Sequence, residues 1–177
     1  MADYITTYTK VHFTPLQPKK EDLHIEDIAH ALSLMTRANG HFPEFYSVGQ
    51  HCIACCKEAV ARGYDNRLSL ACLLHDAAEA YLADVTRPVK AHMDFFRETE
   101  ERLLCVIYER YLGSPLSEKE AEEVRDVDDT LLYYEFLHYM GEELRYPKST
   151  LCSRPEFVLR PFGEIEQEYL DLFYQLY

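Results

Sequence analysis

The sequence predicts one all-α domain with a short extended segment at its start. Apolar residues recur along most of the chain at the three- and four-residue spacing of buried helix faces. Ser47 and Ser117 stand where helix N-caps are expected, and Glu120 completes a Ser-x-x-Glu capping box with Ser117. The length of 177 residues suits a single core, and neither a repeat nor a linker interrupts it. Residues 1–177 are therefore expected to fold as one domain.

The predicted elements follow from residue type and from the positions of glycine and proline. Residues 4–13 are rich in β-branched and aromatic side chains, which favours a short strand or hairpin. Helical spacing then begins, and glycines and prolines mark the ends of successive helices. A loop broken by Pro88 is expected at residues 85–90, and residues 141–161 look irregular because they hold three prolines. The predicted helices cover residues 25–39, 47–62, 66–84, 91–112, 117–140 and 164–177.

The charge of the chain limits its partners. The formal net charge is −13 and the pI is about 5.0, which argues against a protein that binds the phosphate backbone of a nucleic acid. A small phosphorylated substrate is still compatible, because it needs only a local cluster of positive charge. No apolar run is long enough to cross a bilayer, so no membrane partner is expected. The start of the chain shows no signal-peptide pattern, which predicts a protein of the reducing cytosol.

Six cysteines are present, and most lie within helix-like apolar patterns. Cys52-Ile-Ala-Cys55 has the spacing of a metal or redox motif, but it falls inside a predicted helix and has no second pair at zinc-finger spacing. We interpret Cys52 and Cys55 as core packing residues, as buried free thiols often are.

The chemically informative stretch is the end of the helix predicted for residues 66–84. An apolar run leads into His75 and Asp76, and two further carboxylates, Glu79 and Asp84, follow. On a continuous helix His75 and Glu79 would share a face, being four positions apart. Charged groups on an apolar helix are costly without a partner, and a divalent cation would supply one. The alternative is a helix that simply becomes polar where it reaches the surface.

A wider pattern favours the cation. His51 lies on one predicted helix, His75 and Asp76 on a second, and Asp128 on a third. Two imidazoles and two carboxylates from three helices would form a mixed nitrogen and oxygen site for a divalent transition metal. Taken alone, His51 is interpreted more simply as a hydrogen-bonded histidine at the edge of the core.

These motifs resemble the HD-domain metal-dependent phosphohydrolases, in particular the branch that contains the 5′-deoxynucleotidases. The resemblance spans roughly residues 25–140, and its order of His, His-Asp and Asp on successive helices matches this chain. Asp128 is preferred over Asp126 and Asp129 as the last ligand because its spacing to Glu135 fits the family pattern. The matching stretches are residues 27–37, 46–51, 75–90 and 128–135.

The resemblance implies a role for each of these residues. His51, His75, Asp76 and Asp128 would bind one divalent ion, which could be Mn, Co, Mg, Zn, Fe or Ni. No cysteine joins this set, which argues against a closed, sulfur-rich structural zinc site. The remaining assignments are Glu79 and Asp84 as catalytic groups, Arg37 as the phosphate clamp, Lys90 as a more distant positive charge and Ala38 beside the sugar.

The expected activity is hydrolysis of nucleoside 5′-monophosphates to nucleoside and phosphate. The alternatives are a (deoxy)nucleoside triphosphate triphosphohydrolase and a nucleotide-sensing protein that has lost turnover. A homodimer is implied by the resemblance alone. One residue departs from the nucleotidase branch: Ala38 stands where a bulky aromatic can crowd the 2′ position of the sugar. Weak discrimination between ribose and deoxyribose is therefore expected.

Overall fold

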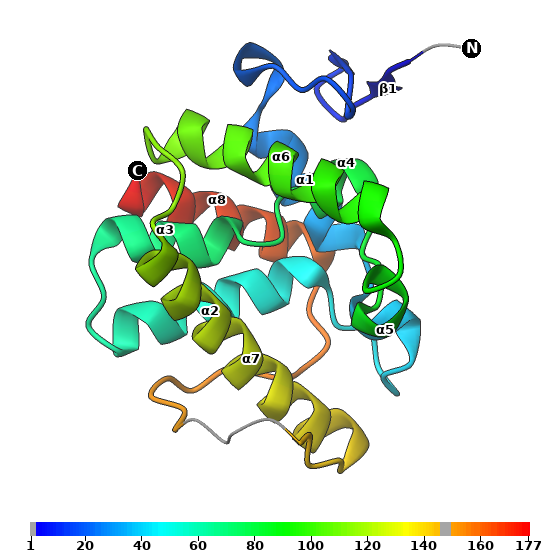
Figure 1. Ribbon diagram of the computed structural model, residues 1–177. Helices are drawn as coiled ribbons and strands as arrows, with labels where there is room; N and C mark the ends of the chain where they lie inside the picture. Colours follow the sequence, from blue (N-terminus) through cyan, green and yellow to red (C-terminus); the bar gives the residue numbers. More distant parts are fainter. Residues whose placement is uncertain (1–2, 146–149) are drawn as a thin grey trace.

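A computed structural model describes residues 3–145 and 150–177 of the chain, and within them the fold is all-α with one small antiparallel hairpin, as predicted (Figure 1). The 3-10 turns are η1 (Lys20–Asp22) and η2 (Arg37–Gly40). The helices are α1 (Ile25–Leu34), α2 (Val48–Ala61), α3 (Asn66–Leu74), α4 (Glu79–Leu82), α5 (Arg87–Lys90), α6 (Asp94–Tyr111), α7 (Glu118–Met140) and α8 (Phe162–Leu176).

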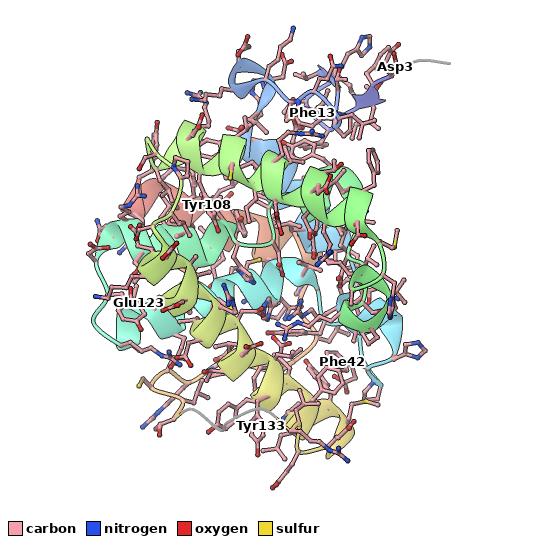
Figure 2. The ribbon with its side chains drawn as sticks, in the orientation of Figure 1. Asp3, Phe13, Phe42, Tyr108, Glu123 and Tyr133 are labelled. Carbon is pink, nitrogen blue, oxygen red and sulfur yellow. The ribbon has the colours of Figure 1, made fainter. Side chains whose placement is uncertain are left out.

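The hairpin lies at one end of the molecule, above α6 in the view of Figure 1. Its strands, β1 (Ile5–Thr6) and β2 (His12–Phe13), pair antiparallel. Figure 2 shows Phe13 on the side of the hairpin that faces the helices; its fully buried ring stacks on Tyr81 at 4.1 Å between centroids. The Asp27 carboxylate of α1 accepts hydrogen bonds from the amide and hydroxyl of Thr9. Ring stacking and these bonds attach the hairpin to the helical body.

Helix α2 is the central element and packs against α1, α3, α7 and α8. It begins where the sequence predicts, because the Ser47 hydroxyl accepts from the Gln50 amide while the Gln50 side chain accepts from the Ser47 amide. Gly49 then allows a close approach to α1: a Cβ at this position would lie 3.1 Å from the Leu32 carbonyl. The first turn of α2 is thus held against the end of α1. This contact fixes the position of His51, which follows Gly49 by two residues.

Four predicted boundaries were wrong. Helix α1 ends at Leu34 rather than near Asn39, and the predicted 66–84 helix stops at Leu74. The predicted loop at residues 85–90 contains the short helix α5, in which Pro88 occupies the first turn, where its missing amide hydrogen costs nothing. The next helix, α6, begins at Asp94 instead of Ala91. Helices α2, α7 and α8 agree with the prediction to within about two residues at each end.

The C-terminal part closes the bundle. Ile165, Tyr169 and Phe173 form the buried face of α8, as their spacing predicts. The irregular segment before α8 is held against α2, where the carboxylate of buried Glu58 accepts the backbone amides of Cys152 and Ser153 at 2.7–3.1 Å. Among the described residues, no helix combines the length and the apolar character needed to cross a membrane.

Candidate metal centre

The four predicted metal ligands converge on one point, although they come from distant parts of the sequence. Helix α7 runs across α2 and α3, which brings its middle next to the second turn of α2 and the end of α3 (Figure 1). His51 Nε2 lies 3.2 Å from His75 Nε2 and 3.0 Å from Asp128 Oδ1. Asp76 Oδ2 lies 3.3 Å from His75 Nε2 and 3.9 Å from His51 Nε2. The four side chains, from three separate parts of the chain, therefore lie together.

The spacing suits a single ion. Donor atoms bound to one ion at ~2.1 Å lie ~3.0 Å apart in octahedral and ~3.4 Å apart in tetrahedral geometry. The two Nε2 atoms lie 3.2 Å apart, and each lies 3.0–3.3 Å from its nearest carboxylate oxygen. These distances fall in this range. The donor set of two imidazole nitrogens and two carboxylate oxygens is therefore compatible with a divalent metal, without identifying it.

The other ring nitrogen of each histidine fixes its tautomer. His51 Nδ1 lies 2.5 Å from the Glu135 carboxylate, and His75 Nδ1 lies 2.8 Å from the Cys72 carbonyl oxygen. Since a carbonyl or carboxylate oxygen accepts, Nδ1 carries the hydrogen in both neutral rings, and the Nε2 lone pair faces the centre. This carboxylate–histidine arrangement is typical of metal sites. Glu135 had been noted only for its spacing from Asp128; a separation of seven residues, two helical turns, was the available signal that both face the same way.

The charges at the centre stabilise one another. Burial alone would raise the pKa of Asp76 and Asp128, but the neighbouring imidazoles hold both values below the usual range, with a further contribution from Arg37 at Asp76. Burial would likewise lower the pKa of His75, yet the Asp76 carboxylate and other neighbours raise it well above its ordinary value. The two carboxylates are thus ionised, and a bound cation would replace the imidazole protons as their counter-charge.

Arg37 reaches this centre from outside any long helix. It follows the bridge between Thr36 and Ser47, and its amide donates to the Tyr46 carbonyl at 2.8 Å. Ala38 and Asn39 then adopt left-handed backbone angles, with φ of 53° and 50°. Such angles are costly for residues with a side chain, and strain of this kind is common beside functional sites.

The Arg37 guanidinium lies among the predicted ligands rather than beyond them. It donates to His51 Nε2 at 3.0 Å and to the Glu135 carboxylate at 3.3 Å, and it lies 3.5 Å from both Asp76 and Asp128. This position differs from the predicted one near the end of a helix. His30 of α1 lies away from this centre, where it contacts Glu166 and the ring of Tyr8.

The segment after His75 is tighter than the predicted helix. Three backbone amides donate to the carbonyl oxygen three residues earlier, which is the pattern of a 3-10 helix. These bonds run from Ala77 to Leu74, from Glu79 to Asp76 and from Tyr81 to Ala78. His75 and Glu79 are therefore not neighbours on one regular α-helix, as had been expected. The backbone then reaches φ 140° at Ala83, a region that side chains rarely adopt, directly before Asp84.

A cleft with a volume of about 440 Å³ opens beside the centre. Its walls include seven of the nine predicted site residues, and the other two, His51 and His75, lie beneath it. The walls also include an apolar group of side chains, Leu132, Phe136 and Leu144. The predicted site residues that line the cleft are Arg37, Ala38, Asp76, Glu79, Asp84, Lys90 and Asp128.

Glu79 has a strongly perturbed carboxyl group in the cleft. Its side chain is 5% exposed, and its Oε2 atom has no hydrogen-bond partner among the described residues. Burial, together with the charges of Asp76 and Asp84, raises the pKa of Glu79 to about 10. Burial also raises the pKa of Asp84, with the charge of Asp76 adding to the effect against that of Arg37. Groups shifted in this way are frequent where protons are transferred.

Among the described residues, the cations that line the cleft are each engaged by carboxylates. Lys90 Nζ lies 2.8 Å from Glu100 and 3.7 Å from Glu79. Arg87, which had been given no role, donates to Asp128 at 2.7 Å and to Asp129 at 2.6 Å. Asp126, the other fallback for the third-helix ligand, pairs with Arg62 away from the cleft.

Cysteine also reaches the centre, which corrects the expectation that none would. Cys52 and Cys55 are buried, as core residues would be. However, Cys55 Sγ lies 3.5 Å from His51 Nε2. Two groups of three side chains include a thiol, and within each group all three donor atoms lie within 4.8 Å of one another. The groups are His51–Cys55–His75 and Cys52–His75–Asp76. The missed signal was the four-residue spacing that places Cys55 on the same face of α2 as His51.

Comparison with known proteins gives relatives without a stated activity. No family model matches the chain. It is 35% identical over 108 residues to uncharacterized protein YfdR of Escherichia coli, covering 61% of this chain and 58% of that protein. It is 39% identical over 102 residues to uncharacterized protein RCAP_rcc00048 of Rhodobacter capsulatus, covering 54% of this chain and 52% of that protein. The matched region thus spans little more than half the length of these curated relatives.

Proposed function

We propose that the cleft is the active site of an HD-domain, metal-dependent phosphohydrolase that converts nucleoside 5′-monophosphates to nucleoside and phosphate. The observation that carries the proposal is a coincidence of two features. Two histidines and two aspartates point their donor atoms at one place, and a buried glutamate with an unpartnered oxygen lies in the cleft beside them. A metal site of structural purpose would not need that costly carboxyl group.

The shape and charge of the cleft suit a nucleotide. Its volume of about 440 Å³ lies within the ~300–1,000 Å³ common for small-molecule sites. In the proposed complex the phosphate enters the charged end, where Arg37 turns from His51 Nε2 to donate two parallel hydrogen bonds to phosphate oxygens. Lys90 adds positive charge from the rim. The sugar lies beside Ala38, and the apolar wall of Leu132, Phe136 and Leu144 receives the base.

The chain's own groups then handle the protons. A divalent ion bound by His51, His75, Asp76 and Asp128 supplies the polarisation of the phosphoryl group and the acidification of water. Glu79 and Asp84 divide two tasks, the removal of a proton from the attacking water and the donation of one to the leaving 5′-oxygen. The pKa of Glu79, raised to about 10, keeps a proton on its carboxyl group at neutral pH, which suits this group to donation.

Two observations favour this activity over the alternatives. A triphosphate needs several cations, but Arg37, Arg87 and Lys90 are each already engaged by carboxylates. A sensor without turnover has no use for buried Glu79, whose burial reduces stability. The six free thiols favour a reducing compartment, and we therefore place the enzyme in the cytoplasm.

A phosphate-release screen tests the proposal. Metal-stripped protein is reconstituted separately with Mn²⁺, Co²⁺, Mg²⁺ and Zn²⁺ and offered ribo- and deoxyribonucleoside mono- and triphosphates. Release of inorganic phosphate from monophosphates, absent in stripped protein, is the expected result. Asp128→Asn should abolish it, whereas the matched variant Asp129→Asn, one residue away, should retain it. Release of triphosphate from triphosphates, or no release by any metal form, would contradict the proposal.

A further inference from the structure

Helix α2 brings sulfur as well as nitrogen to the metal centre. His51 and Cys55 are four residues apart and therefore share one face of the helix. Both side chains are buried, with 0% and 1% of their surfaces exposed, and the Cys55 sulfur lies 3.5 Å from His51 Nε2. The sulfur and the two histidine donors all lie within 4.8 Å of one another. Cys55 thus approaches the nitrogen that faces the proposed ion.

The distances match a sulfur ligand on the same ion. With metal–sulfur and metal–nitrogen bonds of ~2.3 Å and ~2.1 Å, a tetrahedral ion holds the two ligand atoms ~3.6 Å apart. The observed separation from Cys55 Sγ to His51 Nε2 is 3.5 Å, and that from His51 Nε2 to His75 Nε2 is 3.2 Å.

Ligand type then predicts which ions would use the sulfur. Thiolate is a soft ligand that suits zinc and similar ions, whereas magnesium and manganese prefer oxygen. Cys55 lies on the buried side of the centre, while Asp76 and Asp128 lie on the side of the cleft. The same centre therefore offers sulfur on one side and carboxylate oxygen on the other.

We propose that Cys55 is a sulfur ligand of this centre, bound by thiophilic ions such as Zn²⁺ and Co²⁺ and left as a thiol by Mg²⁺ and Mn²⁺. Binding of a thiophilic ion releases the thiol proton to solvent as the metal–sulfur bond forms. The site thereby holds thiophilic ions more tightly than its oxygen and nitrogen donors alone would. The inference rests on the proposed metal centre, but it does not depend on phosphohydrolase activity.

Cobalt provides a direct readout, because thiolate bound to Co²⁺ gives a charge-transfer absorption in the near ultraviolet. Metal-stripped full-length protein is titrated with Co²⁺, and the band is expected to appear with one ion per chain. Cys55→Ser should remove the band. Cys56→Ser is the matched control, since Cys56 is equally buried on the same helix but belongs to neither thiol-containing donor group. In Cys55→Ser, Zn²⁺ affinity should fall ~10-fold or more while Mn²⁺ affinity stays unchanged.

A second measurement needs no variant, in case Cys55→Ser fails to fold. X-ray absorption of zinc-loaded wild-type protein should show a Zn–S distance of ~2.3 Å. Co²⁺ bound without the band, or zinc bound without a sulfur neighbour, would overturn the inference and leave the nitrogen and oxygen centre standing. Loss of the band in Cys52→Ser but not in Cys55→Ser would overturn the assignment to Cys55. A band in protein that releases no phosphate would support the inference while contradicting the proposed activity.

Discussion

Two buried glutamates, Glu58 on α2 and Glu79 on α4, are treated in opposite ways by the fold. The Glu58 carboxylate is fully buried and accepts from Arg62 Nε at 2.8 Å and from the amides of Cys152 and Ser153. Burial would raise its pKa, but hydrogen bonds from Ser153, Arg62 and Cys152 lower it below the usual value. Glu79 is buried nearly as well, yet one oxygen has no partner among the described residues and its pKa rises to about 10.

The difference separates a group that stabilises the fold from one that reduces its stability. Glu58 joins the segment before α8 to the central helix, and its hydrogen bonds offset the free-energy cost of burying its charge. Glu79 has no such compensation, and its nearest cation, Lys90, is 3.7 Å away. Uncompensated burial of this kind is expected where a protein keeps a group for chemistry. Variants of the two glutamates test whether their contributions to stability differ in this way.

The largest effect is expected on stability at Glu58. Glu58→Ala would leave Arg62 and two backbone amides without their acceptor, and removal of one partner from a buried pair costs about 3–5 kcal/mol. Glu79→Ala should leave the stability of metal-free protein unchanged or raise it. Urea unfolding of both variants measures the difference. Equal losses of unfolding free energy would show that Glu79 is also a stabilising residue.

The next effect is expected on catalysis at Glu79. Glu79→Gln keeps the size of the side chain but cannot exchange the proton, so turnover should fall ~10²-fold or more, about 2.7 kcal/mol in the barrier. The bound metal should be retained, because Glu79 lies outside the four proposed ligands. Phosphate release and elemental analysis on the same sample provide the two readouts. Near-normal turnover with full metal content would make Glu79 structural.

The two glutamates should also give opposite pH dependences of stability. The depressed pKa of Glu58 adds stability that is present above the unfolded value of ~4.3 and is lost as pH falls through the folded pKa. The raised pKa of Glu79 means that metal-free protein binds this proton more tightly when folded, so stability falls as pH rises from ~4.3 towards about 10.

Glutamine variants isolate these two contributions to the pH dependence. Unfolding free energies of metal-free wild type, Glu58→Gln and Glu79→Gln are compared from acid to alkaline pH. Glu58→Gln should reduce the loss on the acid side, and Glu79→Gln should reduce the loss on the alkaline side. A change on the same side in both variants would remove the distinction between the two carboxylates.

The smallest predicted effect concerns the sugar. Ala38 lines the cleft, and its small side chain leaves room for a 2′-hydroxyl, so ribo and deoxy substrates should differ by no more than the ~10–200-fold typical of small pocket differences. Ala38→Trp should raise the deoxy preference in kcat/KM by ~10-fold. Ala38→Gly is the control, because glycine tolerates the φ of 53° and should leave the ratio unchanged. A strong preference in the wild type would mean that another residue closes the sugar pocket.

The sequence predicted the parts that depend on local pattern. Capping by Ser47 and Ser117 and the apolar stripes of α2 and α8 are encoded within a few residues, and the structure agrees with them. The order of histidines and aspartates on three helices was enough to expect their meeting. The hairpin that ends at Phe13 agrees with the short strand or hairpin expected for residues 4–13 from their side-chain types.

The parts that were missed depend on contacts between distant residues. The break after Leu74 is not visible in the sequence, because the apolar and helix-forming run contains no glycine or proline there. The left-handed turn at Ala38 and Asn39 lacks the usual glycine. Glu58 finds its partners about 95 residues away, at Cys152 and Ser153, and no periodicity reports such a pairing. Cys55 was correctly assigned to the core, and its four-residue spacing from His51 indicated a shared helix face, but the contact of its sulfur with His51 Nε2 depends on the orientation of the ring.

The most direct test of the account is the metal content of the chain. Metal-stripped wild type, His75→Ala and Asp128→Ala are titrated with Mn²⁺, and binding is followed by the loss of the free-ion electron paramagnetic resonance signal. One tightly bound ion per wild-type chain, with none in either folded variant, is the result that four convergent ligands predict. Two results would contradict the metal centre on which the proposed function rests. One is wild-type binding of Mn²⁺ by both folded variants, and the other is no binding of Mn²⁺ by the wild type.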